Sequence, residues 1–342
     1  MCGIAGFVSE TKNEKLINQL TEKLMHRGPD ELNIEIIKKD NLYYHFGSAR
    51  LSIVGLVDGK MPMVDIDKNC LVYNGELYQL EKIRKNFSDM LNTTSDTRHL
   101  FKLLNQNSGN IDVNDLNGMF AFAYFNSSKG NLTLGRDELG IKPLYYLQTK
   151  EIPFLFCSEV KPIIEAGITN NKMSKKILES YILFGGFNSD TNIIDQIKTL
   201  KPGSLLKWSN NNLEISNPTN DNFKNYENRS FKKDNFLTVL DEVINDQITA
   251  DVPVNILLSG GIDSSIIAWS AKKFISGDIK GFSLYFENDK FNEISAAEEL
   301  SKTLKIPLVK FLFESNSNEQ IIDELLNKDL DAIVSYRIKR KD

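Results

Sequence analysis

The chain has 342 residues, of which 41% are hydrophobic and 25% charged, and a formal net charge of −5. This composition is typical of a soluble globular protein long enough for two domains, and it gives no reason to expect binding to nucleic acid or to an anionic membrane. No apolar run approaches the length of a membrane-spanning helix, so we expect no integral membrane protein.

The cysteines Cys2, Cys70 and Cys157 lie far apart and form neither a metal-ligand pattern nor a disulfide framework. The N-terminus also lacks an apolar signal region. Together these features predict a protein of the reducing cytoplasm.

The first 208 residues are expected to form mostly strands with a few helices. Residues 2–8 alternate small and apolar side chains like a buried strand, and apolar side chains at helical spacing predict a helix over 15–25. The turn-rich pentapeptide 26–30 ends this helix, although it could equally be plain loop. Further strands are predicted at 42–46, 48–54, 70–73, 119–125, 132–134, 144–147 and 154–156, and helices at 77–87 and 97–104.

A domain boundary is expected after Trp208, where residues 209–229 form a polar stretch with eight asparagines. We therefore predict a first domain over 1–208, a linker over 209–230 and a second domain over 231–342. In the second domain, predicted helices at 231–248, 262–274, 293–304 and 319–326 alternate with predicted strands at 254–258, 279–286 and 308–313, as in a parallel α/β fold.

Cys2 is the first candidate for chemistry, because removal of Met1 would make it the N-terminal residue. Its free α-amine, with a pKa of roughly 7.7–8.0, could then take the thiol proton, so no histidine partner is required. None of the three histidines lies in a recognisable Cys/His pattern. The alternative is that Cys2 is simply a small residue at the start of a strand.

The second candidate is the loop Ser259-Gly260-Gly261-Ile262-Asp263-Ser264-Ser265, between a predicted strand and a predicted helix. Two glycines let backbone amides approach an anion, the serines add donors, and the helix N-terminus favours negative charge. No lysine follows the glycines, so the loop is not a Walker motif. The alternative is a tight turn in which Asp263 caps the helix.

The 259–265 loop resembles the pyrophosphate-binding loop of the ATP pyrophosphatase fold. Together with the N-terminal MCGIAGF, it makes the chain similar to the glutamine-hydrolysing asparagine synthetases. The resemblance implies an N-terminal nucleophile hydrolase fold, an αββα sandwich, followed by a partial parallel-sheet ATP-pyrophosphatase domain. It implies ATP contacts at Leu257, Ser259, Gly260, Gly261, Asp263, Ser264, Ser265 and Leu284.

Three more stretches resemble the glutamine site of that family: 47–54, 74–76 and 95–97. The resemblance implies that Arg50 pairs with the substrate α-carboxylate and that Asn74 and Gly75 form the oxyanion hole. It places Ile53 and the Glu76 backbone against the substrate, and the Asp96 carboxylate against the substrate amine. Taken alone, Arg50 could be a surface residue, Asn74-Gly75 a hairpin turn and Asp96 a helix cap.

The chain departs from the family at Gly55, usually acidic, and at Met61, usually glutamine, so the loop 55–63 is expected to close over glutamine differently. Residues 136–146 and 158–161 resemble stretches that build the face between the two domains.

Beyond about residue 313 the resemblance fails. The family's second glycine-acid motif and its acceptor-binding helices do not follow, and one acid at 291–293 does not replace them. We therefore expect a C-terminally truncated chain with a non-functional synthetase half and, at most, a weak Mg²⁺ ligand in Asp263.

These observations predict a glutamine-dependent amidotransferase of the asparagine-synthetase type. Cys2 would release ammonia from glutamine, and the ammonia would pass to a carboxylate activated by ATP and Mg²⁺, which is aspartate in the family. The alternative is a non-catalytic fragment that regulates a partner or binds a nucleotide. A homodimer is left open.

Overall fold

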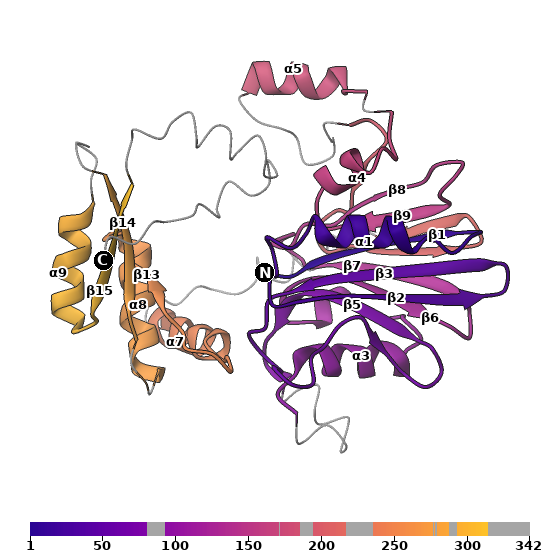
Figure 1. Cartoon of the computed structure of the whole chain (residues 1–342). Helices are drawn as coiled ribbons and strands as arrows, with labels where there is room; N and C mark the ends of the chain where they lie inside the picture. The colour runs from indigo at the N-terminus through magenta and orange to yellow at the C-terminus, as the bar shows by residue number, and fades with distance from the viewer. Residues whose placement is uncertain are drawn as a thin grey trace. The chain divides into compact units, whose positions relative to one another are not determined.

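The computed structural model describes residues 1–80, 93–170, 172–184, 194–216, 235–275, 277, 279–286 and 293–313 (Figure 1). The chain divides into two compact units, Met1–Glu227 and Asn228–Asp342. Within the described residues, no helix is both long enough and apolar enough to cross a bilayer.

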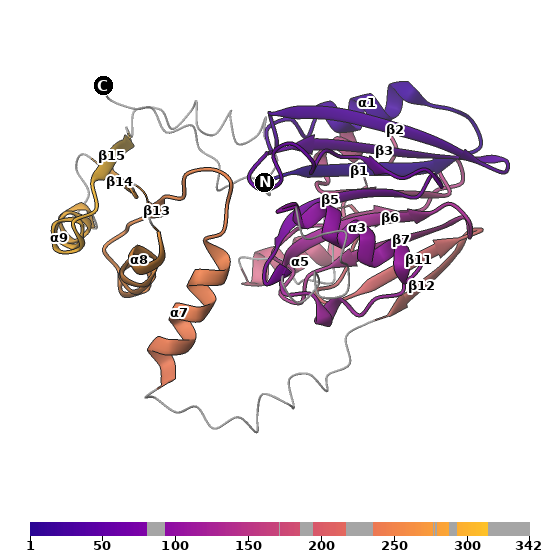
Figure 2. The ribbon, with the colours of Figure 1, turned by 90° about the horizontal axis from the view of Figure 1, so that it is seen from below.

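The first unit contains two antiparallel six-stranded sheets. Viewed from below, the sheets lie as two stacked layers (Figure 2). In spatial order the first sheet contains β10 (Lys198–Thr199), β8 (Tyr145–Leu147), β9 (Phe154–Cys157), β1 (Gly3–Ser9), β3 (Leu42–Arg50) and β2 (Glu31–Lys39). The second contains β12 (Asn212–Ser216), β11 (Leu205–Ser209), β7 (Asn131–Arg136), β6 (Gly118–Asn126), β5 (Cys70–Leu77) and β4 (Met63–Val64).

Helices cover the outer face of each sheet. The helices α1 (Glu14–Glu22) and α4 (Lys161–Glu165) pack beside the first sheet, and α3 (Asp96–Gln106) packs against β5 and β6 of the second. The core between the sheets includes Ile4 and Phe125. This arrangement confirms the predicted αββα sandwich.

The strands β1 and β6 are apolar throughout because both of their faces are buried. In β1, Ile4 and Val8 face the core between the sheets, whereas Ala5 and Phe7 face the helix layer. In β6, alternate residues over 120–125 divide in the same way. Because successive side chains point to opposite faces, a strand buried on both faces must be apolar throughout.

Other parts of the first unit differ from expectation. One strand, β3, replaces the two strands predicted over 42–54, and the partly exposed edge strand β2 was not predicted. Leu77 ends β5 rather than starting a helix, and 81–87 of that predicted helix lies outside the described residues. The helix α5 (Lys175–Phe184), the short 3₁₀ turn at Val113–Asp115 and the strands β4, β10, β11 and β12 were also not predicted.

The stretch expected as a linker begins with a hairpin. The strand β12 pairs with β11 through a two-residue turn, Asn210-Asn211, in which both residues have positive φ, 47° and 65°. Asparagine tolerates this conformation better than most residues. These asparagines therefore make a tight turn at the edge of the sheet, and residues 217–234 lie outside the described part.

The second unit has three parallel strands in the order β13 (Ile256–Leu257), β14 (Gly281–Phe286) and β15 (Leu308–Phe313). The helices α7 (Phe236–Gln247), α8 (Ile262–Phe274) and α9 (Ile294–Leu304) alternate with these strands. This confirms the predicted parallel α/β order up to residue 313, and the helix predicted at 319–326 lies outside the described residues.

One buried histidine joins α1 to the first sheet. The His45 ring stacks on Phe7 with centroids 4.1 Å apart. Its Nε2 accepts the Asn13 N–H at 3.0 Å, so the neutral ring carries its proton on Nδ1, 3.3 Å from the Phe7 carbonyl oxygen. Asn13 in turn caps α1, because its side-chain oxygen accepts the Leu16 N–H at 3.1 Å. Burial lowers the pKa of His45 to about 4.

This histidine predicts acid sensitivity of the fold. Between pH 6.5 and about 4 the unfolded chain protonates His45 and the folded chain does not, so stability is lost as the pH falls. The loss should reach up to about 3 kcal/mol. Urea unfolding at pH 7 and pH 4.5 should show a smaller pH dependence for His45→Asn than for wild type. An equal pH dependence in His45→Asn and wild type would contradict this assignment.

Candidate active site

One pocket in the first unit collects the residues expected to attack or bind glutamine. The residues come from the start of the chain, the end of β3, the loop that follows, β5 and the start of α3. The pocket is lined by Cys2, Arg50, Ile53, Asn74, Gly75, Glu76 and Asp96.

Cys2 lies immediately before β1 and is half-buried in this pocket. Its Sγ accepts the Leu51 N–H at 3.4 Å and lies 3.7 Å from the Leu51 carbonyl oxygen. Burial raises the pKa of the thiol, and the Leu51 hydrogen bond opposes that rise. The thiolate is the attacking form of cysteine, so this site needs nearby positive charge or a base to populate it.

A buried ion pair positions the main chain of Cys2. Arg27 donates from Nε to the Cys2 carbonyl oxygen at 3.0 Å and from Nη1 to Glu159 at 2.6 Å. His26 lies 3.0 Å from the same carboxylate oxygen. Arg27 follows a helix in a turn-rich segment, so the sequence alone gave no signal that distinguishes it from a loop residue.

Asn74 lies in the middle of β5, opposite Ala121 of β6, so it does not belong to a hairpin turn. Its side chain is fully buried, and neither amide atom has a hydrogen-bond partner within the described part of the chain. Buried amides are almost always hydrogen-bonded. An amide in this state beside a thiol is available to a bound ligand.

Gly75 follows on the same strand, opposite Phe120. A Cβ at this position would lie 2.4 Å from the Met119 carbonyl oxygen, so no other residue fits without movement of the backbone. The close approach of β5 and β6 therefore accounts for glycine at this edge of the pocket.

Asp96 does not cap α3, because the N-cap is Ser95, whose Oγ accepts the Arg98 N–H at 3.3 Å. The Asp96 carboxylate is buried and accepts hydrogen bonds from the Tyr73 hydroxyl at 2.9 Å and the Leu77 N–H at 3.1 Å. Burial raises the pKa of Asp96, and these hydrogen bonds oppose the rise. They also hold a carboxylate at the pocket wall, where it could accept an ammonium group.

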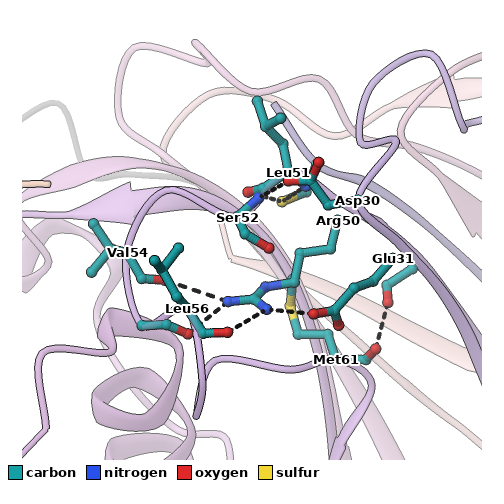
Figure 3. Close-up of polar contacts among 11 residues, drawn as sticks. Asp30, Glu31, Arg50, Leu51, Ser52, Val54, Leu56 and Met61 are labelled. Atoms are coloured by element: carbon teal, nitrogen blue, oxygen red, sulfur yellow. Dashed lines mark hydrogen bonds and ion pairs between the residues drawn. The ribbon is translucent and has the colours of Figure 1, made fainter. Parts of the chain in front are cut away.

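Arg50 is buried, which excludes the surface alternative. Its guanidinium donates to Gly55 O at 2.7 Å and to Glu31 at 3.1 Å, with longer contacts to the carbonyls of residues 54 and 56 at 3.5 and 3.4 Å (Figure 3). The longer contacts are weak. A bidentate carboxylate could displace them while the two shorter ones keep Arg50 in place.

The loop 55–63 contains both departures from the family pattern. Gly55 has φ +61°, a conformation that an acidic residue would adopt only with strain. Met61 is buried, lines the pocket and accepts the Tyr73 N–H on its sulfur at 3.2 Å. Its carbonyl oxygen accepts the Ser48 hydroxyl at 2.7 Å. In this chain an apolar side chain therefore forms this part of the pocket wall.

The Arg50 geometry predicts a large effect of a charge-conserving change. Arg50→Lys should raise the KM for glutamine by about tenfold or more, because an ammonium cannot hold a carboxylate bidentately and also reach the loop carbonyls. Steady-state kinetics tests this. Arg98→Lys, at a cation that is half exposed and pairs with Asp58, is the matched control and should leave KM unchanged. Equal glutamine affinity in the Arg50 variant and wild type would place the α-carboxylate elsewhere.

In the second unit, the stretch 259–265 runs from just after the carboxyl end of β13 into the first turn of α8, where parallel α/β sheets bind ligands. Gly260 has φ +82°, and a Cβ on it would lie 2.6 Å from the side chain of Ala296. The Ser259 hydroxyl lies 3.0 Å from that of Ser264, and Ser265 donates to Gly261 O at 2.7 Å. The structure therefore brings the predicted loop residues together.

Asp263 does not cap α8. The N-cap is Gly261, and no side chain caps this end, so the first backbone N–H groups remain available. Leu257 and Leu284 lie on the neighbouring strands β13 and β14 and are 78% and 47% exposed. An exposed N-terminus with apolar side chains beside it suits phosphate and an aromatic base.

The residues around the 259–265 loop fit a magnesium ion less well than a phosphate group. Among the residues that the structure describes, no group of three or more His, Cys, Asp or Glu could hold a metal ion. Asp263 is the one acid of the loop, and Mg²⁺ usually needs carboxylates together with substrate oxygens. The described residues thus fit a phosphate group and do not by themselves form a magnesium site.

Comparison with known proteins agrees with both halves, and the match to the second half extends to residue 338, past residue 313, where the resemblance was expected to end. Residues 1–219 match the family model of the glutamine amidotransferase domain, and residues 235–338 match that of asparagine synthase. Asparagine synthetase [glutamine-hydrolyzing] 1 of Bacillus subtilis is 30% identical over 95% of this chain and 52% of its own length. Asparagine synthetase [glutamine-hydrolyzing] 3 of the same organism is 32% identical over 86% of this chain and 50% of its own.

The chain thus spans about half the length of these curated relatives. Among solved structures, glutamine phosphoribosylpyrophosphate amidotransferase from B. subtilis aligns over 90% of this chain and 65% of its own with 14% identity and a TM-score of 0.45, too distant to bear on the site. The chain belongs to the glutamine amidotransferase domain family and carries part of an asparagine synthase domain behind it.

Proposed function

We propose that this chain hydrolyses glutamine to glutamate and ammonia at Cys2. The observation that carries the proposal is the unpartnered, fully buried amide of Asn74 in the same pocket as the Cys2 thiol. A hydrogen-bond donor kept ready beside a nucleophile is what stabilisation of a tetrahedral oxyanion requires.

The first step needs a free Cys2 amine, which forms when Met1 is removed. That amine takes the thiol proton, and the sulfur attacks the side-chain carbonyl carbon of glutamine. The oxyanion that forms is held by the Asn74 amide and the Gly75 N–H. The amine then returns the proton to the amide nitrogen of glutamine, and ammonia leaves. A γ-glutamyl thioester remains on Cys2.

In the second step water attacks the thioester carbon, the same amine takes the proton of this water, and glutamate leaves as the thiol is restored. Arg50 and Asp96 hold the two ends of the amino-acid backbone, so that only the side chain reaches the thiol. The Glu76 backbone and Ile53 complete the wall.

The proposal for the second unit is that the 259–265 loop binds ATP phosphates. Ammonia from Cys2 would then be used to amidate a carboxylate activated by ATP with Mg²⁺. The relatives described above are asparagine synthetases, which makes aspartate the proposed acceptor. A homodimer and a cytoplasmic location also belong to this proposal.

The test is glutamate formation from L-glutamine by protein whose N-terminal residue is confirmed as Cys2 by intact mass. L-glutamine should be hydrolysed and D-glutamine should not, because the D-isomer cannot reach Arg50, Asp96 and the thiol together. Folded, Met1-free protein without glutaminase activity would favour the non-catalytic alternative. Pyrophosphate release that depends on both ATP and aspartate, measured on the same preparation, tests the second unit separately. Release would support the amidation step, and no release would agree with the non-functional synthetase half expected from the sequence.

A further inference from the structure

Lys142 reaches into the Cys2 pocket although nothing in the sequence assigned it there. It lines the pocket together with Cys2, Asn74 and Asp96, and its side chain is only 4% exposed. Lysines are almost never this buried without a partner for the charge. Within the described residues, its ammonium has no hydrogen bond or ion pair.

The main chain of Lys142 is held by hydrogen bonds at both its N–H group and its carbonyl group. The Asp137 carboxylate accepts the Lys142 N–H at 3.0 Å and the Phe120 N–H of β6 at 3.1 Å. The Arg136 guanidinium donates to the carbonyls of Lys142 and Gly140, both at 2.7 Å, and to Leu200 O at 2.6 Å. The side chain of Lys142 therefore leaves a rigid loop anchored to the neighbouring strand.

The two arginines near Cys2 are already engaged. Arg50 donates to Glu31 and to loop carbonyls, and Arg27 donates to Glu159 and the Cys2 carbonyl. Their charges are largely balanced where they are. In the described part of the chain, Lys142 is the pocket's cationic side chain that lacks such a partner.

We propose that Lys142 is a positioning residue of the Cys2 site, whose ammonium stabilises the thiolate form of Cys2 in the buried pocket. The inference rests on the proposed function, because it takes Cys2 as the nucleophile. No covalent step involves Lys142. Its charge shifts the equilibrium between thiol and thiolate and so increases the fraction of Cys2 that can attack.

The charges around the two groups are consistent with this coupling. Burial lowers the pKa of Lys142, Arg27 lowers it further, and the nearby Cys2, Asp137 and Glu76 raise it. An interaction by which the thiolate favours the ammonium must equally favour the thiolate. On the thiol itself, burial raises the pKa most, the Leu51 hydrogen bond, the Met1 amine and Arg50 lower it, and Asp96 raises it, so Lys142 is not one of the largest influences on the thiol.

The direct test is the pH dependence of alkylation of Cys2 by iodoacetamide, followed by peptide mass mapping, which separates Cys2 from Cys70 and Cys157. In Lys142→Met the midpoint of alkylation should rise by about one pH unit relative to wild type, the lower end of the range for loss of a nearby opposite charge. Lys142→Arg should restore most of the shift. Lys23→Met, which removes a half-exposed surface lysine paired with Glu165, is the matched control and should show none.

Kinetics supply the second measurement. Lys142→Met should lower kcat for glutamine about tenfold near neutral pH while KM changes less than about twofold, and raising the pH should recover part of the loss. If Lys142→Met does not fold, Lys142→Gln replaces it in both assays. A folded variant with an unchanged alkylation midpoint overturns the inference. If wild type shows no glutaminase activity but Lys142→Met still shifts the alkylation midpoint, the pairing of Lys142 with Cys2 is supported and the proposed function is overturned.

Discussion

Replacing Cys2 with alanine should abolish glutamine hydrolysis, with kcat falling by about 10⁴-fold or more. The thiol is the nucleophile of the proposed mechanism, and no second nucleophile takes its place. The pocket should still bind glutamine, because Arg50 and Asp96 are unchanged. Ammonia release and isothermal titration with glutamine on the same protein separate loss of chemistry from loss of binding.

The matched control for this prediction is Cys70→Ala. Cys70 is fully buried in β5, and burial raises its pKa well above the ordinary value, so it should remain an inert thiol. This variant should lose some stability because it leaves a small cavity, and it should keep wild-type kcat. Wild-type ammonia release by Cys2→Ala would show that another group attacks glutamine.

Replacing Asn74 with alanine should lower kcat by about 10²–10³-fold with little change in KM, because its amide acts on the oxyanion and not on the bound substrate. The same change should cost little stability. In the described part of the chain the amide makes no hydrogen bond that folding would lose, and removing an unsatisfied buried polar group is often favourable. The measurements are steady-state kinetics and urea unfolding.

Asn126→Ala is the matched control and should show the reverse pattern. Asn126 is also buried, yet its side-chain oxygen accepts the Ser128 hydroxyl at 2.8 Å and the Lys129 N–H at 3.0 Å. Its loss should cost about 1–3 kcal/mol of stability and leave kcat unchanged. If Asn74→Ala instead lost stability and kept kcat, Asn74 would be a structural residue and the oxyanion site would lie elsewhere.

The fold was predictable where one periodicity dominates the sequence. The strands β1 and β6 are buried on both faces, and their continuous apolar runs indicate such burial directly. The edge strand β2 has a mixed pattern of exposure, and β12 follows two asparagines that read as linker. In both places pairing with a neighbouring strand decides the structure, and a single sequence does not display such long-range pairing.

The site was predictable only as far as family motifs reach. Cys2, Asn74 and Asp96 come from separate segments, and the resemblance to a family was needed to connect them. Arg27 contacts the Cys2 main chain and Lys142 lines the pocket, because the carboxylates of Glu159 and Asp137 hold their segments. Nothing in the local sequence marks these contacts. The ends of α3 and α8 show the same limit, since Ser95 and Gly261, rather than the acids one or two residues later, are the N-caps.

The measurement that bears most directly on the central claim compares two forms of the same chain, one that begins at Cys2 and one that retains Met1, each verified by intact mass. Both contain the thiol, Asn74 and the rest of the pocket, and they differ in which residue bears the free α-amine. The Cys2-terminal form should release ammonia from glutamine, and the Met1-retaining form should be slower by about 10²-fold or more, because its free α-amine is carried by Met1 and not by the nucleophilic residue itself. Equal rates for the two forms would contradict an N-terminal nucleophile at Cys2.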